Sequence, residues 1–273
     1  MKKLMFAAAV MAAGAVMAVE SQTVGYTTQE ITDGQFAMVG VQFEGVASGD
    51  GEIALKDFIT GDFKGTDWDE NDEYFQTATE IQVWDGTTYA YYYYLNEHTI
   101  EPGTAWEVKV EKGWCDDWGE SAAEVTFIPG QAVWFHNRTG DCTITTPGQV
   151  ITEDDTEIPC ANNTFTMAAN FMPVELDLNN EDQVAYDGIV GTDWDENDEY
   201  FQTATEIQVW DGTTYAYYYY LNEHTIEPGT AWEVKVEKGW CDDWGEFASD
   251  TIAVGRGFWI HARTGDFTVI FKK

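Results

Sequence analysis

The chain is poor in basic residues. Lys and Arg number 13 against 49 Asp and Glu, so the formal net charge is −36. Such a surface repels nucleic acid and anionic membranes, and we therefore expect neither as a partner. It favours cations, either metal ions or basic partners, although a dense anionic surface also keeps an aromatic-rich protein soluble. Charge alone leaves cation binding and solubility as alternatives.

Recognisable catalytic patterns are also missing. The chain has no Gly-x-Ser-x-Gly motif, which a nucleophile elbow requires. The four histidines, His98, His136, His224 and His261, do not have zinc-site spacing. His136 and His261 each follow a tryptophan on an alternating strand and are expected to be structural. Carboxylates are so abundant that any pair with glycosidase-like spacing carries little information. The sequence therefore predicts a protein that is not an enzyme.

Long apolar runs are absent beyond the N-terminus. Lys2 and Lys3 precede the apolar run Leu4–Val16, which is too short to span a bilayer comfortably. Val16-Met17-Ala18 resembles a small-residue cleavage site, so residues 1–18 are predicted to be a secretory signal peptide. We expect an exported protein in the extracellular space, on the cell surface or in the periplasm, without membrane insertion.

No run with a helical period follows this segment. Glu80–Asp85 alternates, with Ile81 and Val83 on one face. Asp85-Gly86 is typical of a hairpin turn, and Tyr89–Leu95 is the expected return strand. Short strands separated by turn signals predict an all-β fold of two tandem antiparallel β-sandwich-like domains.

The main feature that is present is an internal repeat. The 56 residues Gly65–Glu120 recur without substitution as Gly191–Glu246, 126 positions later. The flanks match only with substitutions, as Trp134–Asp141 and Trp259–Asp266 show. The repeat predicts β domains at residues 19–148 and 149–273. Either a recent duplication of the block or selection on both copies explains why the blocks are identical. We expect the protein to contact its partners through these blocks.

Each block opens on an acidic loop. Its oxygen-bearing side chains at alternate positions resemble the start of a calcium loop. The six candidate metal ligands are Asp67, Asp69, Asn71, Asp193, Asp195 and Asn197. Asp72 and Ala78 stand where an EF-hand has glycine and a bidentate glutamate. Calcium in a looser loop is therefore a candidate cofactor, and a solvated acidic turn is the alternative.

Aromatic residues are concentrated in the same block. Tyr89, Tyr91 and Tyr93 share a strand face with Leu95 and are assigned to the core, which puts the alternate tyrosines on the other face. The candidate ligand or interface aromatic residues are Trp84, Tyr92, Tyr94, Trp114, Trp118, Trp210, Tyr218, Tyr220, Trp240 and Trp244. Aromatic rings beside carboxylates suit sugar binding, and they also suit packing against an adjacent domain or subunit.

The chain has four cysteines, which allow three pairings in an exported protein. Cys115 and Cys241 are repeat equivalents, whereas Cys142 and Cys160 flank the inter-domain segment and have no counterparts. We predict a Cys142–Cys160 disulfide across the junction. Closing a loop of roughly 17 residues would stabilise the fold by about 3 kcal/mol.

Several short motifs resemble those of exported bacterial β-rich repeat proteins of uncharacterised function. They are Val24-Gly25-Tyr26, Ile81–Gly86 with the tyrosine strand, Gly130–Trp134 and Gly255–Trp259. The resemblance implies a secreted, noncatalytic β-module and assigns no functional residue.

These observations favour a secreted or cell-surface structural or adhesive protein that acts through contacts with other protein subunits or surface proteins. The alternative is a bivalent protein that binds glycans, with calcium as a candidate cofactor. The two hypotheses differ in whether the aromatic residues face solvent or pack against protein.

Overall fold

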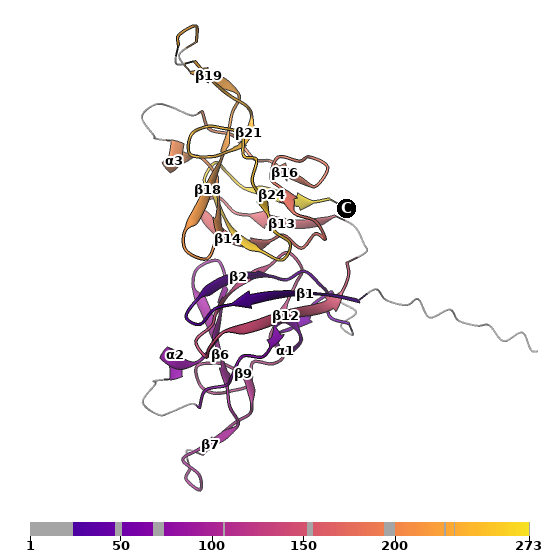
Figure 1. Ribbon diagram of the computed structural model, residues 1–273, viewed down its shortest axis with the longest axis vertical. Helices are drawn as coiled ribbons and strands as arrows, with labels where there is room; N and C mark the ends of the chain where they lie inside the picture. Colours follow the sequence, from indigo (N-terminus) through magenta and orange to yellow (C-terminus); the bar gives the residue numbers. More distant parts are fainter. Residues whose placement is uncertain are drawn as a thin grey trace, which may run out of the picture.

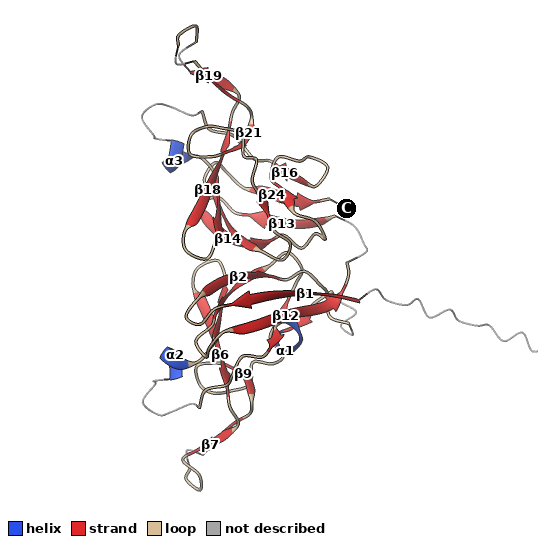
Figure 2. Cartoon of the chain, in the orientation of Figure 1, coloured by secondary structure: helices blue, strands red, loops and turns tan. Residues whose placement is uncertain are grey.

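The computed structural model describes residues 24–46, 51–67, 74–105, 107–151, 155–193, 200–226, 228–231 and 233–272. Strands dominate these residues and their ladders are antiparallel, so the predicted all-β fold is confirmed (Figure 2). The helices in the described part are single turns: α1 (Leu55–Phe58), α2 (Tyr74–Thr77) and α3 (Tyr200–Thr203). No helix among these residues is long and apolar enough to cross a membrane. The predicted signal peptide lies outside the described residues.

The first half of the molecule, residues 24–149, contains two facing sheets. The three-stranded sheet has the order β1-β12-β4 and the five-stranded sheet has the order β2-β11-β5-β6-β9. The three strands are β1 (Val24–Ile31), β4 (Thr60–Gly61) and β12 (Cys142–Gln149). The five are β2 (Phe36–Gly40), β5 (Glu80–Trp84), β6 (Tyr89–Leu95), β9 (Gly113–Cys115) and β11 (Ala132–His136). Two short strands, β3 (Ile53–Ala54) and β10 (Thr126–Phe127), pair with each other.

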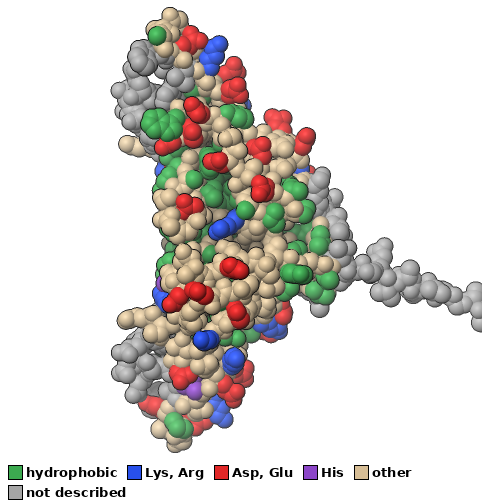
Figure 3. Space-filling model, viewed as in Figure 1, with side chains coloured by type: hydrophobic (Ala, Val, Ile, Leu, Met, Phe, Trp, Pro, Cys, Tyr) green, Lys and Arg blue, Asp and Glu red, His purple; other side chains and the backbone are tan. Residues whose placement is uncertain are grey.

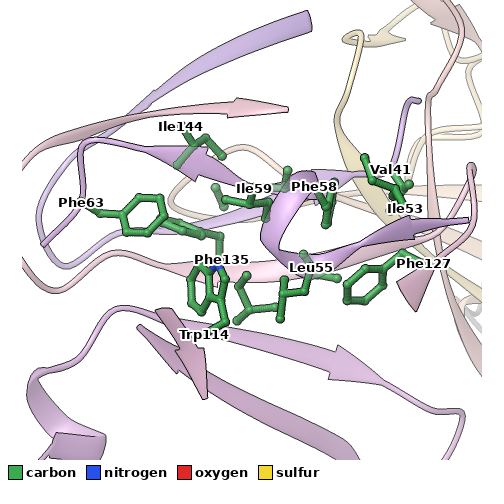
Figure 4. Packing of buried hydrophobic residues seen from close by; sticks show 14 of the residues in the cluster. Val41, Ile53, Leu55, Phe58, Ile59, Phe63, Trp114, Phe127, Phe135 and Ile144 are labelled. Atoms are coloured by element: carbon green, nitrogen blue, oxygen red, sulfur yellow. The ribbon is translucent and has the colours of Figure 1, made fainter. Parts of the chain in front are cut away.

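The core of this half lies between the two sheets. Ile31 and Ile144 project from the three-stranded sheet toward Ile81 and Phe135 of the five-stranded sheet. The turn α1 adds Phe58, which is 1% exposed, and Figure 4 shows it in one cluster with Phe135 and Ile144. Each fully buried large apolar side chain contributes roughly 1.5–3 kcal/mol relative to an exposed one. Burial of one face of each strand therefore explains why apolar and polar residues alternate along the sequence.

The second half, residues 156–272, repeats this arrangement with the sheet orders β13-β24-β16 and β14-β23-β17-β18-β21. Its three-stranded sheet contains β13 (Thr156–Cys160), β16 (Val184–Asp187) and β24 (Phe267–Phe271). Its five-stranded sheet contains β14 (Thr164–Ala169), β17 (Glu206–Trp210), β18 (Tyr215–Leu221), β21 (Gly239–Cys241) and β23 (Gly257–Ala262). A short pair, β15 (Leu176–Asp177) and β22 (Thr251–Ile252), completes it. A separate apolar core fills this half.

A two-stranded hairpin extends from each half. In the first half it is β7 (His98–Ile100) with β8 (Val108–Val110), and in the second β19 (His224–Ile226) with β20 (Val234–Val236). The molecule is elongated, and the two hairpins lie at its opposite ends (Figure 1). The strands that flank the identical blocks, such as β2 and β14, lie toward its middle (Figure 1). The halves therefore point in opposite directions from a shared centre.

The contacts at this centre come in symmetric pairs. The backbone amide of Gly40 donates a 2.8 Å hydrogen bond to the carbonyl of Gly255, and the equivalent amide of Ala169 donates a 2.8 Å bond to the carbonyl of Gly130. The isolated bridges Val39–Arg256 and Gln131–Ala168 repeat the same relation. Each half thus offers the same surface to the other, as the subunits of an isologous dimer do.

Tryptophan side chains extend the same symmetry. Trp84 Nε1 donates to the carbonyl of Phe165 at 2.9 Å, and Trp210 Nε1 donates to the carbonyl of Phe36 at 3.1 Å. The rings of Trp84 and Trp259 meet edge to face with centroids 5.8 Å apart, and the equivalent pair is 6.0 Å apart. An apolar cluster joins the two halves here, formed by Met38, Ala132, Trp134, Met167, Ala169 and Trp259. The halves are consequently held together by hydrogen bonds and by ring packing.

Candidate functional site

Each identical block extends from the centre of the molecule, where Trp84 or Trp210 contacts the other half, to one of its two outer ends. In its described part each block supplies a single-turn helix and five strands, two of which form the protruding hairpin. The turns α2 and α3 lie toward opposite ends of the molecule (Figure 1). The segments that differ between the halves include β1, β2, β12, β13 and β14, which lie nearer the middle. The repeat therefore gives the molecule two ends of the same sequence that face away from each other.

Among the described tryptophans of each block, one faces solvent. Of the eight tryptophans in the described part of the chain, Trp118 is 72% exposed and its equivalent Trp244 is 73% exposed. The other six are buried or half-buried. An exposed indole carries a large apolar area that gains free energy when a partner covers it.

The loop that holds Trp118 is fixed by hydrogen bonds from its own backbone amides, two of them to the Asp116 side chain. Asp116 Oδ1 accepts hydrogen bonds of 2.9 Å from the amides of Trp118 and Glu120. The amide of Asp116 donates to the carbonyl of Glu120, which closes the loop directly after β9. Gly119 has a φ of 75°, a conformation that favours glycine and that the turn requires. The loop is preorganised, so ordering it on binding costs little entropy.

The second copy reproduces this geometry. Asp242 Oδ1 accepts 2.9 Å bonds from the amides of Trp244 and Glu246, and Gly245 has a φ of 75°. Identical sequence and nearly equal exposure of Trp118 and Trp244 make the two loops equivalent in geometry.

The surroundings of both loops are acidic. Each block holds 14 acidic and 2 basic residues, so the two blocks carry −24 of the formal charge of −36. Asp117 and Glu120 are exposed beside Trp118. Figure 3 shows acidic side chains over both halves, with few basic ones among them. Each end therefore presents an indole ring within a field that attracts cations.

The remaining candidate aromatic residues do not form an exposed platform. Trp114 is 4% exposed and Trp240 is fully buried, so both belong to the cores. Trp84 and Trp210 lie between the halves. These four residues were predicted from the sequence to serve a ligand or an interface, and the structure places two of them at the internal interface.

The predicted faces of the tyrosine strand are wrong. Ile81 pairs with Tyr92 across the hairpin, whereas Trp84 pairs with Tyr89. Directly paired residues in antiparallel strands share a face, so Tyr92 lies with Ile81 on the core side. Tyr92 and Tyr94 accordingly pack against the main core, and Tyr218 and Tyr220 do so in the second half.

The opposite face of the tyrosine strand is covered only in part. Tyr93 and Leu95 are buried in a small cluster with Val110, and Tyr89 lies beside the interface between the halves. Tyr91 is 41% exposed. The assignment of all three to the core is therefore correct for Tyr93 alone. The prediction took the face that carries Leu95 as the core face, but apolar side chains are buried on both faces of this strand.

The predicted calcium loops fall mostly outside the described residues. Asp69, Asn71, Asp195 and Asn197 lie there, so their role as metal ligands stays a prediction. Asp67 and Asp193 are described, and each accepts a 2.8 Å hydrogen bond from an asparagine amide, Asn96 and Asn222 respectively. Within the described residues no group of three or more His, Cys, Asp or Glu side chains is arranged to hold a metal ion.

The predicted Cys142–Cys160 disulfide is not formed. Cys142 pairs with Ile31 and lies in the first core, whereas Cys160 pairs with Phe267 and lies in the second. All four cysteines are free and buried. Burial raises the pKa of each thiol to about 11, and nearby carboxylates add to the effect at Cys115, Cys142 and Cys241. The prediction failed because the two residues, although near in sequence, enter different cores.

A buried ionic cluster lies on each five-stranded sheet. Glu80 is 3% exposed and accepts hydrogen bonds from Arg138 at 3.0 and 3.2 Å and from Gln82 at 2.7 Å. His136 Nδ1 lies 3.3 Å from the same carboxylate, and its ring stacks on Phe36. Burial alone would raise the pKa of Glu80, but these hydrogen bonds and the charge of Arg138 lower it overall.

The second half repeats this cluster as Glu206, Gln208, His261 and Arg263. Burial and the neighbouring Arg263 lower the pKa of His261, against the opposing effect of Glu206. The histidines are structural, as the sequence indicated. Their carboxylate partners were missed, although the pattern His-x-Arg in both halves could have suggested a shared acidic partner.

The junction between the halves contains one hollow of about 380 Å³, lined in part by Trp84, Ile128 and Phe165. The symmetry-related place, beside Val39 and Gly255, has a hollow of about 30 Å³. These two symmetry-related hollows are therefore unequal in size, in contrast to the two outer loops, which have the same geometry.

Comparisons with known proteins give no relative: no family model matches the chain, and no curated protein or solved structure is detectably similar to it. The resemblance to exported β-rich repeat proteins stays a prediction.

Proposed function

We propose that this protein is an exported structural or adhesive connector that binds one copy of the same partner protein at each end. The observation that carries the proposal is that the two opposite ends of the molecule are each built from one of the identical blocks. Two equal sites that face apart can bridge two copies of a partner, and bridging raises avidity without any new contact. Export is part of the proposal and is supported by the N-terminal residues Met1–Ala18.

The partner that suits these ends is a basic protein surface. Two blocks of net negative charge repel each other, so direct end-to-end contact between copies is disfavoured. Lysine and arginine side chains on a partner would be attracted to Asp117 and Glu120. The same charges would also steer association, which should weaken as salt is added.

Trp118 and Trp244 are the proposed anchors. Tryptophan is enriched among the residues that dominate interface energies, and a rigid loop adds to its effect. A partner would cover the ring with an apolar pocket or place a cation over its face. The role is noncatalytic, since these loops offer contact and charge.

One observation favours the alternative of glycan binding. The exposed Trp118 ring lies beside Asp117, and a sugar can stack its C–H face on such a ring while its hydroxyl groups bond to the acid. Against this, the neighbouring Trp114 is buried, so each loop offers a single ring. A small platform of this kind suits a protein contact better than a tight sugar site.

The test separates binding from bridging. Fluorescently labelled mature protein is added to intact cells of the producing organism, and both bound fluorescence and cell clumping are measured. Trp118→Ala and Trp244→Ala should each retain binding but lose clumping, because one end remains. The double variant should lose both. Ile128→Ala, which changes an exposed apolar residue outside the blocks, is the matched control.

Binding and clumping that survive in the double variant would overturn the role of the tryptophans. Binding abolished by glycosidase treatment of the cells, together with binding to a glycan array, would establish the alternative. Clumping that is lost on calcium chelation alone would point to the acidic loops in place of the tryptophans.

A further inference from the structure

The symmetry axis between the halves passes close to two pairs of equivalent positions. Gly40 faces Ala169, which is the residue equivalent to it in the second half. Ala132 faces Gly257 in the same way. At each of these places one half contributes a glycine and the other contributes an alanine.

The space at both places fits one methyl group and not two. A Cβ atom added at Gly40 would lie 2.5 Å from the Cβ of Ala169. A Cβ atom added at Gly257 would lie 2.6 Å from the Cβ of Ala132. Both distances are far below the 3.5–4.0 Å at which carbon atoms attract. Neither glycine has a positive φ, so the backbone does not require glycine there. Close approach of the halves is the reason for both.

This arrangement favours pairing of a first half with a second half over pairing of two first halves or two second halves. Two first halves joined in this way would bring Ala132 against Ala132 and leave a gap between two copies of Gly40. Two second halves would bring Ala169 against Ala169 and leave a gap between two copies of Gly257. Each like pair has one clash and one void, whereas the native pair has neither. Overpacking and cavities both destabilise a tight interface.

We propose that the central faces of the two halves form a heterotypic recognition pair, in which each face fits the central face of the other half and rejects its own kind. A symmetric interface has been made selective by the exchange of single methyl groups, and rejection of the wrong partner is a recognised source of specificity. Pairing of the two central faces makes the two ends of the molecule point in opposite directions. This inference does not depend on which partner the ends bind.

Variants of the full chain with unchanged composition test this inference. Ala169→Gly with Gly257→Ala reproduces the contacts of two first halves, and Gly40→Ala with Ala132→Gly reproduces those of two second halves. The four changes together again leave one methyl group at each place, but it then comes from the opposite half. Urea unfolding followed by tryptophan fluorescence suits the measurement, because Trp134 and Trp259 lie in the interface.

Each double variant should raise the unfolding equilibrium constant by about tenfold or more. The fourfold variant should return most of the way to the original value, because its pairs are again one glycine and one alanine. Should a double variant fail to fold, recovery of folded protein in the fourfold variant gives the same result. If the losses of the two doubles add in the fourfold variant, or if the doubles match the original chain, the inference is wrong.

Discussion

Replacing Trp84 with phenylalanine removes one hydrogen bond across the centre of the molecule and keeps most of the ring. The lost bond is the 2.9 Å contact from Trp84 Nε1 to the carbonyl of Phe165. A hydrogen bond of this type contributes about 0.5–1.5 kcal/mol, so Trp84→Phe should lower the free energy of unfolding by about 1 kcal/mol. Trp84→Ala also removes the packing of the ring on Tyr89 and Trp259 and should cost about 3 kcal/mol.

The symmetry of the molecule supplies the control. Trp210 makes the equivalent 3.1 Å bond to Phe36, so Trp210→Phe and Trp210→Ala should cost nearly as much as their counterparts. The assay is urea denaturation of all four variants, with the slope compared to that of the original chain. If Trp84→Ala and Trp210→Ala both unfold at the original midpoint, the halves do not pack as described. Strongly unequal costs would contradict the two-fold relation.

Four further predictions concern the core, the charges, the thiols and the exposed loops. Phe135→Ala removes a fully buried ring and should cost about 3–5 kcal/mol by thermal or urea unfolding, and a cost below 1 kcal/mol would contradict the core assignment. Glu80→Gln leaves Arg138 half-buried without its counter-ion and should cost about 3 kcal/mol at neutral pH. The pKa of Glu80 is lowered by folding, so its contribution is present above the unfolded-state pKa and is lost as pH falls through the folded pKa. As pH is lowered from 7, the free energy of unfolding should thus fall less in Glu80→Gln than in the original chain. An equal fall with pH in both proteins would refute this. All four cysteines should resist a thiol reagent in the native protein and react after unfolding without reductant, whereas two unreactive cysteines in unfolded protein would restore the disulfide hypothesis. Trp118→Ala and Trp244→Ala should change stability by less than about 0.5 kcal/mol, because the rings are exposed, and a larger loss would assign them a structural role.

The strands were largely predictable because their signals are local. The alternation at Glu80–Trp84 correctly put Ile81 and Val83 on one face, which the structure shows to be the core face, and Asp85-Gly86 correctly marked the hairpin. The turn is stabilised by Asp85 Oδ1, which accepts bonds from the amides of Thr87 and Thr88. The tyrosine strand was harder, since four consecutive tyrosines carry no periodicity. Its faces are set by the register with β5 and by the hairpin that covers Leu95.

The candidate site was predictable only in part. Sequence alone placed Trp114 and Trp118 together as equal candidates, four positions apart in one block. The fold separates them, because β9 directs Trp114 into the core and the Asp116 turn directs Trp118 to solvent. The sequence likewise could not predict that Cys142 pairs with Ile31 and Cys160 with Phe267, because these pairs join strands that are far apart in the chain.

The sequence by itself determined the all-β character, the doubling and the acidic nature of the repeated block, because composition, alternation and repetition are properties of the chain alone. The tertiary structure alone decided which aromatic residues face solvent and that the two identical blocks point apart. Those outcomes depend on contacts between distant residues at the centre, where single methyl groups on Ala132 and Ala169 fill the space left by Gly257 and Gly40.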